Sequence, residues 1–270
     1  MTATTGAAGG RRWAPRPLIP NPTVRWVVRL LVLAYLAAVF VTVDVNWGRV
    51  AEGVERSGRL LGQFLEPDFT SRWRDIRIGI LESLTMTVVA TAAGVLLAIP
   101  VSLGAARNLA PLPIYLLTRA YIALSRTFPE VIVAIVFVVM MGFGPFAGLL
   151  TLTFASVGFV AKLLAEDIED IDDAQLEAMR ATGASWWQVV AFAVVPQVMP
   201  RFVGLSVYRL DINFRESTIL GIVGAGGIGA TLTTAMSRYD FDSAGAILLI
   251  VIAIVLALEY LSGYVRSAVQ

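Results

Sequence analysis

Charged side chains occur inside otherwise apolar segments, and these residues are the best suited to chemistry in this chain. Three arginines and two acids lie within Met199–Gly221, and Arg126 and Glu130 lie in another apolar stretch. A charge at the centre of a membrane helix costs roughly 2.5–3.5 kcal/mol, so such residues usually pair or line a polar path. A planar guanidinium group also binds phosphate-like oxygens through two parallel hydrogen bonds. These residues predict internal ion pairs, a path for an oxygen-rich anion, or both.

Helical spacing divides the polar residues of Met199–Gly221 between two faces. One face is a candidate substrate path, and its residues are Arg209, Asn213, Glu216 and Ser217. On the opposite face Asp211 and Arg215 are four residues apart and can pair, although Arg215 is kept as a candidate path residue. Arg209 has no acid four residues away and is the stronger candidate for contact with an anion. Ion pairs that only hold the helices together remain the alternative.

Arg126 and Glu130 are also four residues apart, on one face of a predicted span that Pro129 should kink. We assign both to the same path, and a buried pair that serves only packing is the alternative. Acids beside the arginines would keep an anion from binding too tightly.

Several classes of site are excluded or disfavoured by composition and motifs. The chain has no Cys and no His, and it contains neither a P-loop nor a G-x-S-x-G motif, so we predict no catalytic or metal-binding residues. Gly224, Gly226 and Gly229 form a literal G-x-G-x-x-G, but no acid follows about 20 residues later, as a dinucleotide site requires. We instead predict that these glycines and Gly227 form a tight, gating turn at a helix end. A net charge of +1 gives no indication of a nucleic-acid partner.

Composition places the chain among integral membrane proteins. It is 57% apolar and 15% charged, with a mean hydropathy of +0.75. A spanning helix needs about 20 apolar residues, and helices satisfy their own backbone hydrogen bonds in lipid. The sequence therefore predicts an all-α polytopic bundle in the lipid bilayer with about six transmembrane helices. The expected spans are Trp26–Val45, Gly79–Leu103, Ile114–Met141, Phe146–Ala165, Met199–Gly221 and Ala244–Tyr264.

Three regions follow from this pattern. Residues 1–23 form a Gly-, Ala- and Pro-rich tail, 24–78 hold the first span and an amphipathic loop, and 79–265 form the core. In the loop, apolar residues from Trp47 to Leu65 recur at helical spacing, which indicates an interfacial helix. Arginines flank the first span on both sides, so the positive-inside rule does not decide the orientation.

The polar segment 166–196 interrupts the apolar spans and is predicted to form a compact helix–turn–helix. Asp172 or Asp173 could cap a first helix, Gly183 should end it, and a second helix should begin at Ala184 or Ser185. An ordinary acidic loop is the alternative interpretation.

The spacing of this segment resembles the EAA loop of ABC-importer permeases. Four positions match in register: Glu177, Ala178, Gly183 and Pro196. Three others depart from the pattern: Met179, Ala193 and Val195 replace Ala, Ile and Leu. The resemblance implies a type I importer fold in which this loop, with Arg180 and Ala184, docks on a separate ATPase subunit.

Two further strings resemble the phosphonate-transporter branch of that family. They are Arg209–Gly229, and Arg126–Glu130 followed by Gly142–Gly148. This resemblance implies a permease that carries phosphonate or a related phosphorus oxyanion, works as a homodimer, and binds two ATPase subunits and an extracytoplasmic binding protein. ATP and Mg would bind to the ATPase subunits and no cofactor to this chain. The permease would lie in the inner membrane of a prokaryote with both termini in the cytosol.

Two alternatives stay open. A permease of the same fold could carry methionine or another amino acid, and an ATP-independent channel, carrier or membrane enzyme is the alternative of another class. The sequence does not identify the phosphorus oxyanion.

Overall fold

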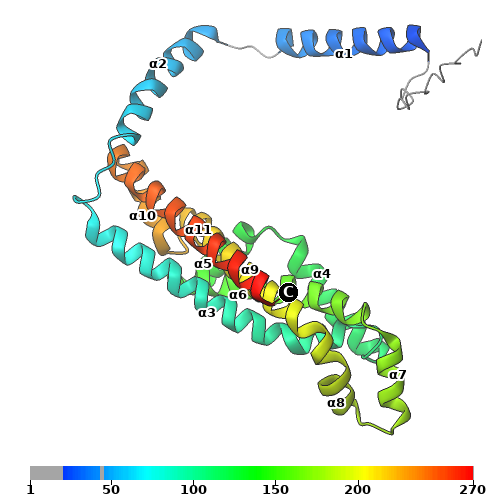
Figure 1. Ribbon diagram of the computed structural model, residues 1–270. Coiled ribbons are helices and arrows are strands. Elements are labelled where there is room, and N and C mark those ends of the chain that lie inside the picture. Colours follow the sequence, from blue (N-terminus) through cyan, green and yellow to red (C-terminus); the bar gives the residue numbers. More distant parts are fainter. Residues whose placement is uncertain (1–20, 43–45, 270) are drawn as a thin grey trace, which may run out of the picture. The chain divides into compact units, whose positions relative to one another are not determined.

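The computed structural model describes residues 21–42 and 46–269, and this part of the chain is helical and contains no strand (Figure 1). The predicted tail lies almost entirely outside the described residues. The chain divides into two compact units at Arg59–Leu60. In chain order the helices are α1 (Pro22–Thr42), α2 (Trp47–Phe64), α3 (Trp73–Ala105), α4 (Leu112–Thr127), α5 (Glu130–Met141), α6 (Pro145–Glu169), α7 (Asp173–Ala181), α8 (Trp186–Val189), the π-helix η1 (Val190–Val194), α9 (Val195–Ile222), α10 (Gly227–Ser237) and α11 (Phe241–Val269).

The N-terminal unit contains α1 and most of α2. Helix α1 is long and apolar enough to cross a membrane, and its large apolar side chains are exposed along its length. The predicted helix in the following loop is confirmed as α2, where Glu52 and Arg56 form an ion pair of 3.0 Å on the polar face.

The C-terminal unit is built around α3, whose 33 residues correspond to about 50 Å at 1.5 Å per residue. Helix α3 packs against α4, α6, α9 and α10. Small residues allow this close packing: a Cβ on Gly158 of α6 would collide with Ser125 of α4, and one on Gly104 of α3 would lie 2.8 Å from Thr118 of α4.

The number of helices that could span a membrane agrees with the predicted all-α bundle of about six transmembrane helices. In residues 21–42 and 46–269, five helical stretches are long and apolar enough to span, or six if α4 and α5 form one broken span. The fifth predicted span is longer than expected, since one helical stretch runs from Trp186 to Ser237 and includes α10.

The predicted kink at Pro129 is a complete break, with α4 and α5 bent by 95°. Proline lacks a backbone N–H and disfavours helical geometry in the preceding residue, and Phe128 is accordingly extended (φ −85°, ψ 128°). The expectation that Arg126 and Glu130 share one helical face is therefore wrong, because Arg126 ends α4 and Glu130 begins α5.

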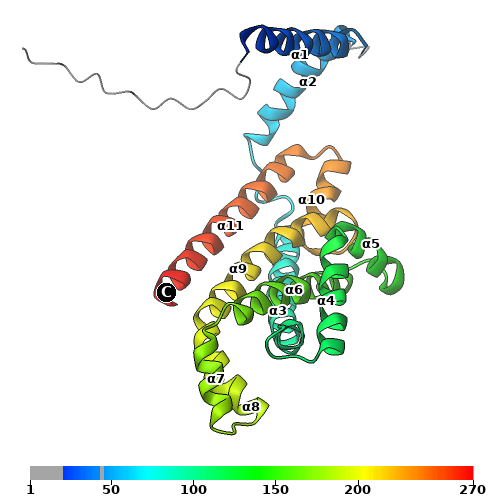
Figure 2. The ribbon, with the colours of Figure 1, turned by 90° about the vertical axis from the view of Figure 1, so that its right-hand side faces the viewer.

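Two polar ends bound the C-terminal unit. Helices α7 and α8 lie together at one end of this bundle, far from α10 (Figures 1 and 2). At the other end Arg72, just before α3, forms an ion pair of 2.7 Å with Asp240, between α10 and α11. Because α3 runs between these ends, its length separates them.

Candidate functional site

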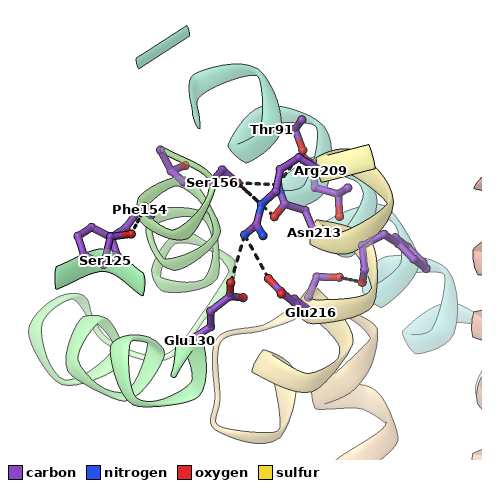
Figure 3. Close-up of polar contacts among 12 residues, drawn as sticks. Thr91, Ser125, Glu130, Phe154, Ser156, Arg209, Asn213 and Glu216 are labelled. Carbon is purple, nitrogen blue, oxygen red and sulfur yellow. Dashed lines mark hydrogen bonds and ion pairs between the residues drawn. The ribbon is translucent and has the colours of Figure 1, made fainter. Parts of the chain in front are cut away.

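Arg209 lies in the middle of α9 and is almost completely buried, with 2% of its side chain exposed. Its Nε donates a hydrogen bond of 2.9 Å to the hydroxyl of Ser156 on α6. The side-chain amide of Asn213 donates to the same hydroxyl at 2.9 Å and to Thr91 of α3 at 2.8 Å. These contacts tie α3, α6 and α9 together and fix the inner edge of the guanidinium group (Figure 3).

The outer edge of the guanidinium group points toward two carboxylates (Figure 3). One Nη atom of Arg209 lies 3.3 Å from Glu130 of α5 and 3.3 Å from Glu216 of α9. About a quarter of each glutamate side chain is exposed, at 26% and 25%. Both glutamate side chains are therefore more accessible from outside the chain than the arginine that they contact.

Arg126 reaches the same cluster from α4. Its guanidinium carbon lies 5.3 Å from the centre of the Phe159 ring, and that of Arg209 lies at the same distance. Both arginines thus contact one aromatic ring of α6. Arg126 is exposed, unlike Arg209, and the alternative of a packing pair between Arg126 and Glu130 is not realised, since Glu130 pairs with Arg209.

Two predicted path residues lie away from this cluster. Arg215 pairs with Asp211 at 2.6 Å, which confirms the predicted i,i+4 pair. The hydroxyl of Ser217 is buried and donates to the carbonyl of Phe214 at 2.7 Å, within its own helix. The structure therefore brings together Arg126, Glu130, Arg209, Asn213 and Glu216.

One face of α9 carries exposed polar residues at seven-residue intervals. Arg201, Tyr208 and Arg215 repeat at this spacing, with 69% of the Arg201 and 57% of the Arg215 side chain exposed. Both arginines retain acidic partners, Arg201 through a contact of 2.9 Å to Asp167. Charges on a membrane helix avoid lipid and face a bundle interior or a water-filled cavity, so this face of α9 requires polar surroundings.

The glycine-rich segment forms the predicted tight turn between α9 and α10. Gly224, Gly226 and Gly227 all have positive φ, at +89°, +75° and +75°. A Cβ on Gly226 would lie 2.6 Å from the backbone nitrogen of Pro145, and one on Gly229 would collide with the carbonyl of Thr218. The side chain of Glu82 accepts a hydrogen bond of 3.0 Å from the N–H of Gly227 and so ties α3 to this turn.

The segment 166–196 forms the predicted helix–turn–helix. The side chain of Asp172 caps α7 by accepting from Ala174 at 3.0 Å, and Gly183 has φ +77° just after that helix. Ser185 then begins α8 through a capping box with Gln188.

This segment has a buried anchor and an exposed surface. Leu176 is buried in a cluster with α6 and η1, while Arg180 and Trp186 donate to the carbonyls of Asn108 and Leu109 at 2.9 and 3.2 Å. The remaining predicted coupling residues lie mostly on the outside: Glu177, Ala178, Gly183 and Pro196 are exposed, and Ala184 is half-buried. Helices α7 and α8 therefore form a compact knob that is anchored to the bundle and leaves its outer surface accessible to a partner protein.

Three residues of the cluster were not predicted from the sequence. Thr91 of α3 and Ser156 of α6 are small polar residues in long apolar helices, and Phe159 of α6 is one of 13 phenylalanines in the chain, so none of the three stands out. The available signal was weak: Ser156 and Phe159 lie three residues apart and so on one face of α6.

Comparison with known proteins places the chain in a family. Residues 90–269 match the family described as binding-protein-dependent transport system inner membrane component. The inward-facing MetNI methionine ABC transporter has a related fold, with a TM-score of 0.64 and 25% identity, over 73% of this chain and 97% of that one.

Two curated relatives are more similar in sequence. The phosphate-import permease protein PhnE of Mycolicibacterium smegmatis is 43% identical over 85% of this chain, which spans only 43% of that relative's length. The phosphite transport system permease protein PtxC of Stutzerimonas stutzeri is 40% identical over 80% of this chain and 78% of its own. The chain therefore belongs to the family of inner-membrane components of binding-protein-dependent transport systems, as a multi-pass permease.

Proposed function

We propose that this permease imports a phosphorus oxyanion, such as phosphonate, phosphite or phosphate, into the cytoplasm. The observation that carries the proposal is the similarity to permeases named for phosphate and phosphite, at 43% and 40% identity. The buried Arg209 supports it, because a guanidinium group held by its inner edge offers its outer edge to a tetrahedral anion.

The path of the anion passes the outer edge of Arg209 and continues beside the exposed polar face of α9. Two copies of the chain form a homodimer with this face turned inward, which removes the exposed Arg201 and Arg215 from lipid. Arg126, Glu130, Asn213 and Glu216 flank Arg209 in each copy. The turn with Gly224 and Gly226, together with Gly227 and Gly229 at the start of α10, gates the path.

Energy for transport comes from two ABC ATPase subunits that bind ATP and Mg. They dock on the knob formed by α7 and α8, whose exposed side bears Glu177, Ala178 and Gly183. This places α7 and α8, both termini and residues 166–196 in the cytosol. An extracytoplasmic binding protein delivers the anion to the opposite end of the permease.

Methionine is the weaker alternative cargo, since the methionine transporter shares the fold at 25% identity. An ATP-independent carrier would leave the exposed knob without a partner.

The test is reconstitution of the permease in proteoliposomes with its co-encoded ATPase and binding protein. Uptake of labelled phosphate, phosphite and methylphosphonate is measured, with methionine and sulfate as comparison solutes. ATP-dependent uptake of at least one phosphorus oxyanion supports the proposal, and uptake of methionine alone refutes it.

A further inference from the structure

The acids beside Arg209 block the group that an anion would need. Arg209, Glu130 and Glu216 together carry a net charge of −1, and the two glutamate side chains, each about a quarter exposed, contact an arginine with 2% of its side chain exposed. An anion approaching this edge meets negative charge first. In the conformation described, the site is closed to its ligand by electrostatics and by contact.

The contacts that close the site are loose. Both distances from Arg209 to its carboxylates are 3.3 Å, whereas the other arginine ion pairs of the described residues measure 2.6 to 3.0 Å. Charge-assisted hydrogen bonds between nitrogen and oxygen normally measure about 2.7–2.9 Å. The second carboxylate oxygen of Glu130 is buried and has no hydrogen-bond partner. Asp167 and Asp211, the partners of Arg201 and Arg215, also have one such oxygen each. The distances of 3.3 Å are therefore what distinguish Glu130 and Glu216 from the other acidic partners of arginine.

Glu130 and Glu216 differ in the elements that carry them. Glu216 lies on α9, seven residues from Arg209, so it moves with the arginine. Glu130 begins α5, a helix of 12 residues that is joined to α4 through a 95° break. A shift of α5 changes the distance from Glu130 to Arg209 and leaves Glu216 in place.

We propose that Glu130 is a displaceable counter-ion, which occupies the edge of Arg209 until α5 moves and the transported anion takes its place. Removing Glu130 changes the net charge of Arg209 and its two acids from −1 to 0. With Arg126 on the shared Phe159 ring included, the net charge of the cluster changes from 0 to +1. The site thus attracts the anion in one conformation and expels it in the other. This inference rests on the proposed oxyanion cargo.

The test uses the permease–ATPase complex in lipid nanodiscs without the binding protein, and measures equilibrium binding of labelled inorganic phosphate. In Glu130→Gln, affinity should rise about tenfold or more, since one of the negative charges next to the bound anion is removed. In proteoliposomes with the complete transporter, the maximal rate of uptake by the same variant should fall, because the anion is no longer expelled. Glu130→Ala serves as a second charge-removing variant if the first fails to assemble.

Two controls make the result specific. Asp240→Asn removes a carboxylate that is similarly exposed (31%) and also pairs with an arginine, at the far end of α3, and should leave affinity unchanged. Adding Arg209→Gln to Glu130→Gln should abolish the gain. An unchanged affinity in Glu130→Gln, or a gain that persists without Arg209, overturns the inference.

Failure of the proposed function gives a different result. If the complete transporter imports no phosphorus oxyanion, the same titration is run with sulfate, another tetrahedral anion. A gain for sulfate that depends on Arg209 supports the counter-ion role with another cargo, whereas the absence of a gain for both anions refutes it.

Discussion

At the scale of single residues, Arg209 combines two properties that usually exclude each other in a membrane helix. It is buried like a structural residue, and its inner edge is bound by Ser156. Its outer edge meets only long contacts to Glu130 and Glu216. The first property fixes its position, and the second leaves hydrogen-bonding capacity for a ligand.

Substitution of Arg209 should separate these two roles. Arg209→Gln leaves two acids facing each other, but both are partly exposed, so the loss of stability should stay below the roughly 3–5 kcal/mol expected for breaking a fully buried pair. Uptake per folded complex should fall at least tenfold, and Arg209→Lys should restore little, because lysine lacks the planar fork. Uptake and thermal stability are measured on the same preparations. If uptake merely follows the amount of folded complex, Arg209 has only a structural role.

Asp240 should make stability depend on pH. Burial raises the pKa of its carboxyl, but hydrogen bonds from Ser243 and the ion pair with Arg72 together lower it below the ordinary value. A lowered folded-state pKa contributes stability above the unfolded value of about 3.9, and this contribution is lost as the pH falls through the folded-state pKa. Asp240→Asn should therefore melt earlier than the original chain at pH 7. The difference should begin to shrink as the pH falls below about 4 and vanish only below the folded-state pKa. A constant difference down to pH 3 would contradict this.

At the scale of elements, Gly183 determines how α7 is connected to α8. Its φ of +77° suits glycine, but a Cβ there would meet no atom within 4 Å. Gly183→Val should cost about 1–2 kcal/mol locally through backbone strain alone, so the protein should insert while uptake and substrate-stimulated ATPase activity collapse. Gly183→Asn is the matched control, because asparagine tolerates positive φ, and should keep most activity. Normal coupling in the valine variant would refute a role of this turn in docking.

Gly226 differs from Gly183, because at Gly226 both the backbone φ angle and the space for a Cβ are restricted. A Cβ there would lie 2.6 Å from the Pro145 nitrogen, so Gly226→Ala should destabilise the protein by about 1–3 kcal/mol through overpacking, in addition to the strain at positive φ. A Cβ on Gly263 of α11 would meet no atom within 4 Å, and Gly263→Ala should be neutral or stabilising. Thermal unfolding of both variants in detergent decides, and equal melting temperatures would contradict the expectation.

The helices and their ends could be predicted from the sequence where the features that determine them lie close together along the chain. Apolar length identified the spans, and Asp172, Gly183 and Ser185 marked the ends of α7 and α8. The break at Pro129 was expected only as a kink, because the direction of the chain after a proline depends on what α5 packs against. The pairing of Glu130 with Arg209 joins residues 79 positions apart, and no spacing rule within one helix reaches that far. For the same reason Ser156 and Thr91 could not be assigned to the cluster.

At the scale of the whole molecule, the two polar ends of the C-terminal unit assign its residues to opposite sides of the membrane. Helix α3 is a single uninterrupted helix of 33 residues, longer than the roughly 20 needed to span. Arg72 at its start contacts Asp240, and Asn108 just beyond its end contacts Arg180. Any orientation that puts α7 in the cytosol therefore puts the α10–α11 turn outside.

Cysteine labelling tests this orientation, since the chain contains no cysteine of its own. Ala181 and Ser237 are both exposed, at opposite ends of the unit. Ser185, on the same side of the unit, stays unsubstituted because it caps α8. In spheroplasts, which lack the outer layers of the cell envelope, a membrane-impermeant maleimide should label Ser237→Cys and not Ala181→Cys. Inverted inner-membrane vesicles should give the reverse pattern. The unsubstituted chain should stay unlabelled in both. Labelling of Ala181→Cys from outside would show that the topology is the reverse of the one inferred. Helices α7 and α8 could then not dock on an ATPase in the cytosol.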